Sequence, residues 1–204
     1  MQPKQMRIVI FVFCLTVGVL SGLIALIVTN TPKMDHMQLG TSFSLTDDRG
    51  QPITDAALRG HPTLLFFGFT HCPEVCPTTL YEMSGWFKAL GPEADNLKAF
   101  FFSVDPERDT PELMHNYTSS FTDRITGVTG DPVEMEKVIK SWKVYAKKVP
   151  TEGGDYTMDH TASVFLLDTK GNLEGTISYG SSTETAIAKI RNLLSKSDSL
   201  DLAS

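Results

Sequence analysis

Cysteine is scarce in this chain. Three cysteines occur in 204 residues, and one of them, Cys14, lies in an apolar run near the N-terminus. The rest of the chain holds only Cys72 and Cys76, which are too few to staple a small fold with several disulfides. Because these two lie four residues apart, we expect the pair to have a chemical role rather than an architectural one.

Basic residues are scarce as well. Residues 29–204 contain 16 Lys and Arg residues against 24 Asp and Glu residues, a net charge of −8. Proteins that bind nucleic acids neutralise phosphates with clusters of Lys and Arg. The acidic composition therefore predicts no nucleic-acid partner.

Charge is absent from one long run near the N-terminus. Residues 8–28 are uncharged and mostly apolar, and as a helix they would span about 31 Å, the thickness of a bilayer core. Lys4 and Arg7 precede this run, which predicts a single transmembrane helix with residues 1–7 in the cytoplasm. A cleaved signal peptide is the alternative, but its apolar region is usually shorter and no clear cleavage site follows.

This topology predicts a single-pass protein of the inner (cytoplasmic) membrane, with its C-terminal domain on the periplasmic or another extracytoplasmic side. Residues 29–40 have the polar composition of a tether. Residues 41–195 are long enough for one domain with a sizeable core. Residues 196–204 are expected to form a flexible tail.

Apolar periodicity predicts the fold of this domain. Two charge-free apolar runs are typical of central strands covered on both faces, and other runs alternate like strands. The predicted strands are residues 42–45, 63–69, 99–104, 163–167 and 173–179. Helical spacing predicts one helix that ends at Gly91 and others that begin near Thr110, Asp131 and Ser181. This order indicates an α/β fold, a thioredoxin-like sandwich.

The strand order also locates a site. Right-handed crossovers place the carboxyl ends of strands 63–69 and 99–104 at one edge of the sheet, where ligands of open α/β sheets bind. Cys72 and Cys76 follow the first of these strands. If strand 163–167 runs antiparallel to it, His160 faces the two cysteines.

Two thiolates and one imidazole suit a soft metal ion. At helical spacing the Cβ atoms of Cys72 and Cys76 lie about 5–6 Å apart, so both sulfurs could bind one ion or, with some loop adjustment, each other. With His160 they form a three-ligand set suited to Cu(I), whereas zinc usually takes a fourth ligand. Asp159 could orient the imidazole. Spacing alone leaves a metal site, a disulfide and a buried apolar pair open.

Three ordered motifs carry a family resemblance. Residues 68–77 (GFTHCPEVCP), residues 103–111 (SVDPERDTP) and Asp159-His160 together resemble the Sco/SenC family of copper proteins that act in cytochrome c oxidase assembly. The similarity extends over residues 38–195. Glu74 stands where the family commonly has aspartate, a change that keeps the charge.

The resemblance implies a function. It implies a thioredoxin-like fold, copper bound by Cys72, Cys76 and His160, and delivery of copper or electrons to the dinuclear copper centre of oxidase subunit II. A copper donor is then a second partner. Cu(I) is favoured by the donor set, and Cu(II) is left open.

Two further groups of residues have open roles. Carboxylates of residues 105–109, Asp105 among them, could hold the cysteine loop or meet a partner, and the family motif favours the first role. Met34, His36 and Met37 form a cluster of soft donors in the tether. This cluster could pass copper transiently, or it could reflect ordinary linker composition.

Two other functions compete with copper binding. A thiol-disulfide oxidoreductase or thiol peroxidase on the same fold would use Cys72 and Cys76 as catalytic residues. Three residues separate these cysteines, however, whereas redox motifs have two, and His160-Thr161 occupies the place where thioredoxins carry a cis-proline. A plain membrane-tethered interaction module is the third possibility, and in that case neither thiol would matter.

Overall fold

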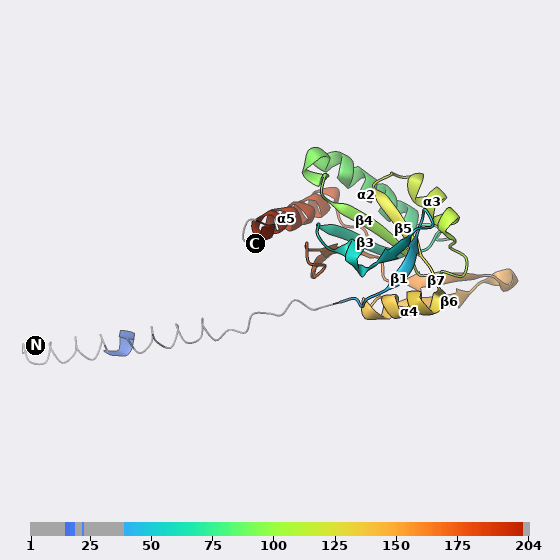
Figure 1. Ribbon diagram of the computed structural model, residues 1–204, viewed down its shortest axis with the longest axis horizontal. Coiled ribbons are helices and arrows are strands. Elements are labelled where there is room, and N and C mark those ends of the chain that lie inside the picture. The colour runs from blue at the N-terminus through green and yellow to red at the C-terminus, as the bar shows by residue number, and fades with distance from the viewer. Residues whose placement is uncertain (1–14, 19–21, 23–38, 202–204) are drawn as a thin grey trace, which may run out of the picture. The chain divides into compact units, whose positions relative to one another are not determined.

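The computed structural model describes residues 15–18, 22 and 39–201 (Figure 1). Most of the predicted membrane run and its tether, with Met34, His36 and Met37, lie outside the described residues. Within the described residues, no helix is long and apolar enough to cross a membrane.

The domain is built on a seven-stranded sheet with the order β2-β1-β5-β4-β3-β8-β9. Its strands are β1 (Ser44–Asp47), β2 (Pro52–Thr54), β3 (Thr63–Gly68), β4 (Lys98–Ser103), β5 (Ile125–Thr129), β8 (Ser163–Leu167) and β9 (Leu173–Ser178). The three central strands β5, β4 and β3 are parallel, and β8 runs antiparallel to β3. The carboxyl ends of the central strands and the start of β8 therefore meet at one edge. The sequence predicted this for β3 and β4, and for β8 on the condition that it runs antiparallel to β3, which it does.

Helices cover both faces of this sheet (Figure 1). They are α2 (Val75–Leu90), α3 (Pro111–Ser119), α4 (Pro132–Ser141) and α5 (Thr183–Asp201), with short 3-10 turns η1 (Asp55–Leu58), η2 (Gly91–Ala94) and η3 (Glu152–Gly154). Figure 1 shows α4 on the side of the sheet opposite to α2 and α3. Coverage on both sides explains why all six residues of β3 are buried.

Local capping sets the starts of α3 and α4. The Thr110 hydroxyl accepts a hydrogen bond from Leu113 N, and Pro111 stands at the first helical position. The Asp131 carboxylate accepts from the main-chain N–H groups of Val133 and Glu134. These contacts satisfy amides that have no partner within the helix. Both helix starts were predicted from sequence.

Aromatic side chains fill the centre of the sheet. Phe66, Phe67, Phe101 and Phe102 have no exposed surface, and Phe66 stacks on Phe101 with 5.8 Å between ring centroids. Burying a phenylalanine contributes about 1.5–3 kcal/mol. The strands that end at the predicted site are thus held by buried aromatic packing.

The structure adds elements that the sequence analysis missed. Strand β5 completes the parallel centre, and β6 (Ala146–Pro150) pairs with β7 (Tyr156–His160) in a separate two-stranded sheet. The predicted first strand lies two residues later, at β1. Helix α5 continues to Asp201 and so takes in residues 196–201, which were assigned to a flexible tail.

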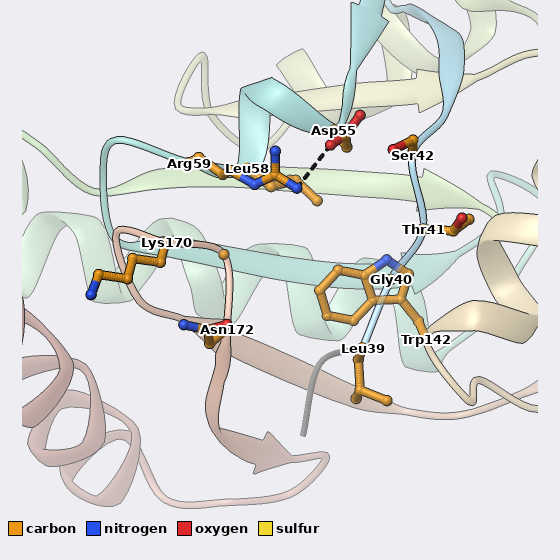
Figure 2. A pocket seen from close by; sticks show the side chains of 11 residues that line it. Leu39, Gly40, Thr41, Ser42, Asp55, Leu58, Arg59, Trp142, Lys170 and Asn172 are labelled. Carbon is orange, nitrogen blue, oxygen red and sulfur yellow. Dashed lines mark ion pairs between the residues drawn. The ribbon is translucent and has the colours of Figure 1, made fainter. Parts of the chain in front are cut away.

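A cavity of about 230 Å³ lies between the segment before β1, the η1 turn and the turn after β8 (Figure 2). Arg59 and Asp55 form an ion pair of 2.9 Å in its lining. Trp142 forms part of the wall beside Gly40. Neither cysteine of the predicted site nor His160 lines this cavity.

Candidate metal centre

The two cysteines lie on the turn between β3 and α2. Cys76, in the first turn of α2, is fully buried, and Cys72 is half-buried. The Cys76 main-chain N–H points at the Cys72 sulfur, 3.4 Å away. The Glu74 side chain at the N-cap makes no hydrogen bond to the helix start. The Cys72 sulfur takes this place and accepts from the main-chain amide of Cys76. Free amides and the helix dipole stabilise a thiolate there.

Space for the Cys76 sulfur depends on Gly68. A Cβ atom at Gly68 would lie 2.7 Å from Cys76 Sγ and 2.6 Å from the Phe101 ring. Real Cβ atoms do not approach other atoms this closely, so any larger residue would displace the sulfur or the ring. The glycine that ends β3 is therefore required by packing.

His160 reaches the cysteines from β7. Its Nε2 lies 3.4 Å from Cys76 Sγ, and its Nδ1 lies 3.0 Å from the carbonyl oxygen of Thr161. Only an N–H group can donate to a carbonyl, so this contact places the proton on Nδ1 and leaves a lone pair on Nε2. The ring is held between Phe66 and Phe69, which it meets edge to face.

The predicted set of three side chains is therefore brought together. One ligand atom from each of Cys72, Cys76 and His160 lies within 4.8 Å of the other two. The antiparallel course of β8 predicted this placement. Two sulfurs and an imidazole nitrogen at this separation fit a soft metal ion of low coordination number.

The two thiols are electrostatically unequal. The pKa of Cys72 is lowered, first because the Cys76 thiol donates a hydrogen bond to its sulfur and also because the main-chain N–H of Cys76 points at that sulfur, although burial opposes the shift. The pKa of Cys76 is raised by the same hydrogen bond and by burial. These opposite shifts favour the thiolate on Cys72 and the protonated thiol on Cys76 in the reduced pair.

A buried carboxylate of the 105–109 stretch contacts the cysteine loop, as the sequence analysis expected of this stretch, but the residue is Asp109 and not Asp105, which was named for the role. Asp109 is 1% exposed and accepts hydrogen bonds from the Thr70 hydroxyl and the Ser103 hydroxyl, both at 2.6 Å, and from Thr70 N. Burial raises the pKa of Asp109 in spite of these donors. The only sequence signal for this role was its position in the 103–111 motif.

The two predicted supporting aspartates lie elsewhere. The Asp105 carboxylate contacts Arg108 and the Tyr156 hydroxyl, at the β7 strand rather than the cysteine loop. Asp159 was expected to orient the His160 imidazole, but it is exposed. The main-chain carbonyl of Thr161 contacts the imidazole instead. A main-chain acceptor leaves no trace in residue type, so sequence reasoning could not find it.

Fold and site together define a class. A thioredoxin-like sandwich with a reduced cysteine pair at the end of a central strand, and a histidine beside it, belongs to the thiol proteins that bind soft metals or exchange disulfides. The profile of the SCO1/SenC family matches residues 31–195. The chain belongs to the SCO1/SenC family.

Several relatives illustrate the similarity. The mitochondrial SCO1 homolog 1 of Arabidopsis thaliana is 36% identical over 142 residues, covering 69% of this chain and 42% of the relative. The SCO2-like protein RP587 of Rickettsia prowazekii is 32% identical over 183 residues, covering 84% and 88%. The chain thus spans about half the length of the mitochondrial relatives from Arabidopsis and yeast and most of the bacterial one.

Solved structures agree with this fold. Bradyrhizobium japonicum ScoI with copper bound is 51% identical with a TM-score of 0.71, covering 76% of this chain and 99% of that one. BsSco, described as a Sco-family cytochrome c oxidase assembly protein with a disulfide switch, is 25% identical with a TM-score of 0.63, covering 78% and 96%. The fold at the site is therefore the family's own.

The unequal thiols predict unequal reactivity. In the reduced, metal-free protein, we expect iodoacetamide to label Cys72 before Cys76 and to label it below the ordinary thiol pKa, because Cys72 is the thiolate. Cys76→Ala removes the donor and should move the pH midpoint of Cys72 labelling upward. Mass spectrometry of tryptic peptides across a pH series measures both rates. Equal labelling of the two cysteines would contradict the assignment.

The buried Asp109 predicts a pH effect on stability. Its raised pKa means that the folded state binds more protons than the unfolded state just above the ordinary carboxyl pKa, so its contribution to stability falls as pH rises through that window. Asp109→Asn removes this dependence. We expect the free energy of unfolding of the variant, minus that of wild type, to increase with pH from 4 upward in urea titrations. Asp159→Asn, which makes the same change at an exposed carboxylate, is the control for the substitution itself.

Proposed function

We propose that this protein is a membrane-anchored copper chaperone that supports assembly of the dinuclear copper centre of cytochrome c oxidase. The observation that carries the proposal is the cluster of Cys72, Cys76 and His160, whose ligand atoms lie within 4.8 Å of one another. Membership of the SCO1/SenC family and the copper-bound Bradyrhizobium ScoI support it. The residues before the domain would anchor it in the inner membrane, facing the periplasm or an equivalent compartment.

The chemistry of the donor set favours Cu(I). Thiolate sulfur is a soft ligand, and Cu(I) accepts three ligands, whereas structural zinc sites take four. Among the described residues, no fourth His, Cys, Asp or Glu joins the cluster. Cu(II) is the alternative state of the cargo.

The three ligands have different tasks in uptake. The Cys72 thiolate, half-exposed at the helix start, is the group that incoming copper meets first. Cys76 is buried and its raised pKa favours the protonated thiol, so binding through its sulfur would release a proton. His160 needs no such change, because the hydrogen bond from Nδ1 to Thr161 already leaves the Nε2 lone pair free. Release to the copper domain of oxidase subunit II would follow by ligand exchange, and a separate donor would reload the site.

Replacing His160 tests the three-ligand site. His160→Ala should weaken Cu(I) binding by at least tenfold, since loss of even a supporting partner of a metal ligand costs about 10- to 100-fold. An anaerobic titration in competition with a chromogenic Cu(I) chelator measures the affinity. The control is His71→Ala. His71 adjoins Cys72 in the sequence, but its Nδ1 lies 3.0 Å from the Thr70 hydroxyl and it is not part of the three-residue cluster, so its loss should leave the affinity unchanged. Equal affinity of His160→Ala and wild type would rule out the three-ligand site.

Thiol-disulfide exchange with the target is the alternative function. The observation in its favour is the half-exposed Cys72 with a lowered pKa beside a second thiol. In this reaction the Cys72 thiolate attacks a disulfide of the target and Cys76 resolves the mixed disulfide. Two electrons and the single proton of the Cys76 thiol leave the pair, and the target takes any second proton from the solvent.

Substitution of His160 also separates the two functions. Without copper, the reduced domain should reduce an oxidised subunit II copper domain at a rate that His160→Ala changes little, if reduction is the main function, because no step requires the imidazole. Thiol counts on both proteins before and after mixing measure the transfer. Absence of transfer between these proteins, with copper handed over normally, would contradict the reductase function.

A further inference from the structure

The β6–β7 hairpin carries His160 but is not part of the main sheet. The two strands pair only with each other, and an isolated two-stranded sheet is marginally stable in water. A cavity of about 390 Å³ also lies between the hairpin and the domain, lined by residues of β6, α4 and the loop after β4. The hairpin is therefore not packed against the domain along its whole length. Other contacts must therefore hold β7 in place.

We propose that Arg108 and Tyr156 form a clamp that positions His160 against the cysteine pair. The inference rests on the proposed copper-binding function, and it concerns how the three ligands are held before the ion arrives. Arg108 lies in the loop after β4, and Tyr156 is the first residue of β7. Neither residue touches the predicted ligands.

Arg108 contacts both its own loop, after β4, and the start of β7. Its Nε donates to the buried Asp105 carboxylate, and its Nη1 donates to the Tyr156 carbonyl at 3.0 Å and to Asp155 at 3.2 Å. The guanidinium also lies over the Tyr156 ring, 3.8 Å from its centroid. The side chain is 20% exposed, so these interactions are less screened than at a free surface.

Tyr156 completes the connection. Its hydroxyl donates to Asp105 at 2.8 Å, so ring, hydroxyl and carbonyl of one residue are all fixed on the loop after β4. In a strand, alternate residues share a face, which places Tyr156, Met158 and His160 on the same side of β7. Tyr156 and His160 are four positions apart, about 13 Å along the strand. Fixing Tyr156 on the loop after β4 therefore restricts where the imidazole can lie.

The same loop holds the cysteines. Asp105 N donates to the Ser103 hydroxyl, which donates in turn to Asp109, and Asp109 accepts from Thr70 two residues before Cys72. Hydrogen bonds therefore run without a gap from β7 to the cysteine loop. A lysine at position 108 would keep the charge but lose the planar fork that reaches Asp105 and the Tyr156 carbonyl together.

A double-mutant cycle tests the clamp. Arg108→Lys should weaken Cu(I) binding by about tenfold or more, the range for residues that support a metal ligand, and should change affinity less than about threefold when His160 is already alanine. Tyr156→Phe, which loses only the hydroxyl, should act in the same direction more weakly. If Arg108→Lys fails to fold, the cycle with Tyr156→Phe decides.

A copper-free measurement accompanies the cycle. Hydrogen exchange of the metal-free protein should be faster in residues 146–160 of Arg108→Lys and unchanged in β3 and β4. The control is Arg124→Lys, because Arg124 also donates to main-chain carbonyls, of Ala94 and Leu97, and lies over the Phe87 ring, away from the site. It should alter neither exchange in the hairpin nor Cu(I) affinity.

The two failures are distinguishable. Unchanged exchange in residues 146–160, or an equal loss of affinity with and without His160, would overturn the clamp. A wild-type protein that binds no Cu(I), or binds it as tightly without His160, would overturn the proposed function instead, whatever the exchange shows. Faster exchange together with a loss that depends on His160 supports the clamp.

Discussion

The site depends on one close approach between distant parts of the chain. Cys76 Sγ and His160 Nε2 lie 3.4 Å apart although 84 residues separate them. The sulfur is fixed at the end of the buried sheet, where β3 and α2 leave it almost no freedom. The imidazole is carried on a small hairpin outside that sheet. The geometry of the candidate metal centre therefore depends on how firmly the hairpin is held.

The loop that follows β4 meets this requirement from both sides. Asp109 faces the cysteine loop through Thr70, and Asp105 faces the hairpin through Tyr156. Both carboxylates are buried, and an unpaired buried charge is costly, so each lies against hydrogen-bond donors from two residues. A single short loop thus fixes the separation between the sulfur ligands and the nitrogen ligand.

Sequence reasoning reached the parts of this arrangement that local patterns encode. The charge-free run of β3 and the capping residues Thr110 and Asp131 follow from residue types. The antiparallel course of β8 entered the sequence analysis only as a condition; the structure meets it and brings Cys72, Cys76 and His160 together. Strand β6 carries two lysines and a proline, so it has no apolar alternation to detect. Sequence spacing does not say which way a side chain or carbonyl points. It therefore could not show that Asp109, rather than Asp105, contacts the cysteine loop. Nor could it show that the Thr161 carbonyl, rather than Asp159, contacts His160.

The position of His160 also bears on the two chemistries open to the cysteine pair. A thiolate beside a thiol serves metal uptake and disulfide exchange equally well, because Cys72 initiates both. A disulfide between the sulfurs needs nothing from an imidazole, whereas a bound Cu(I) ion gains a third ligand from it. Holding the Nε2 lone pair against Cys76 before any ion arrives therefore favours the metal-bound state over the oxidised one. Under the two proposed functions, the contacts that fix the hairpin would therefore bear on which of them the cysteine pair performs.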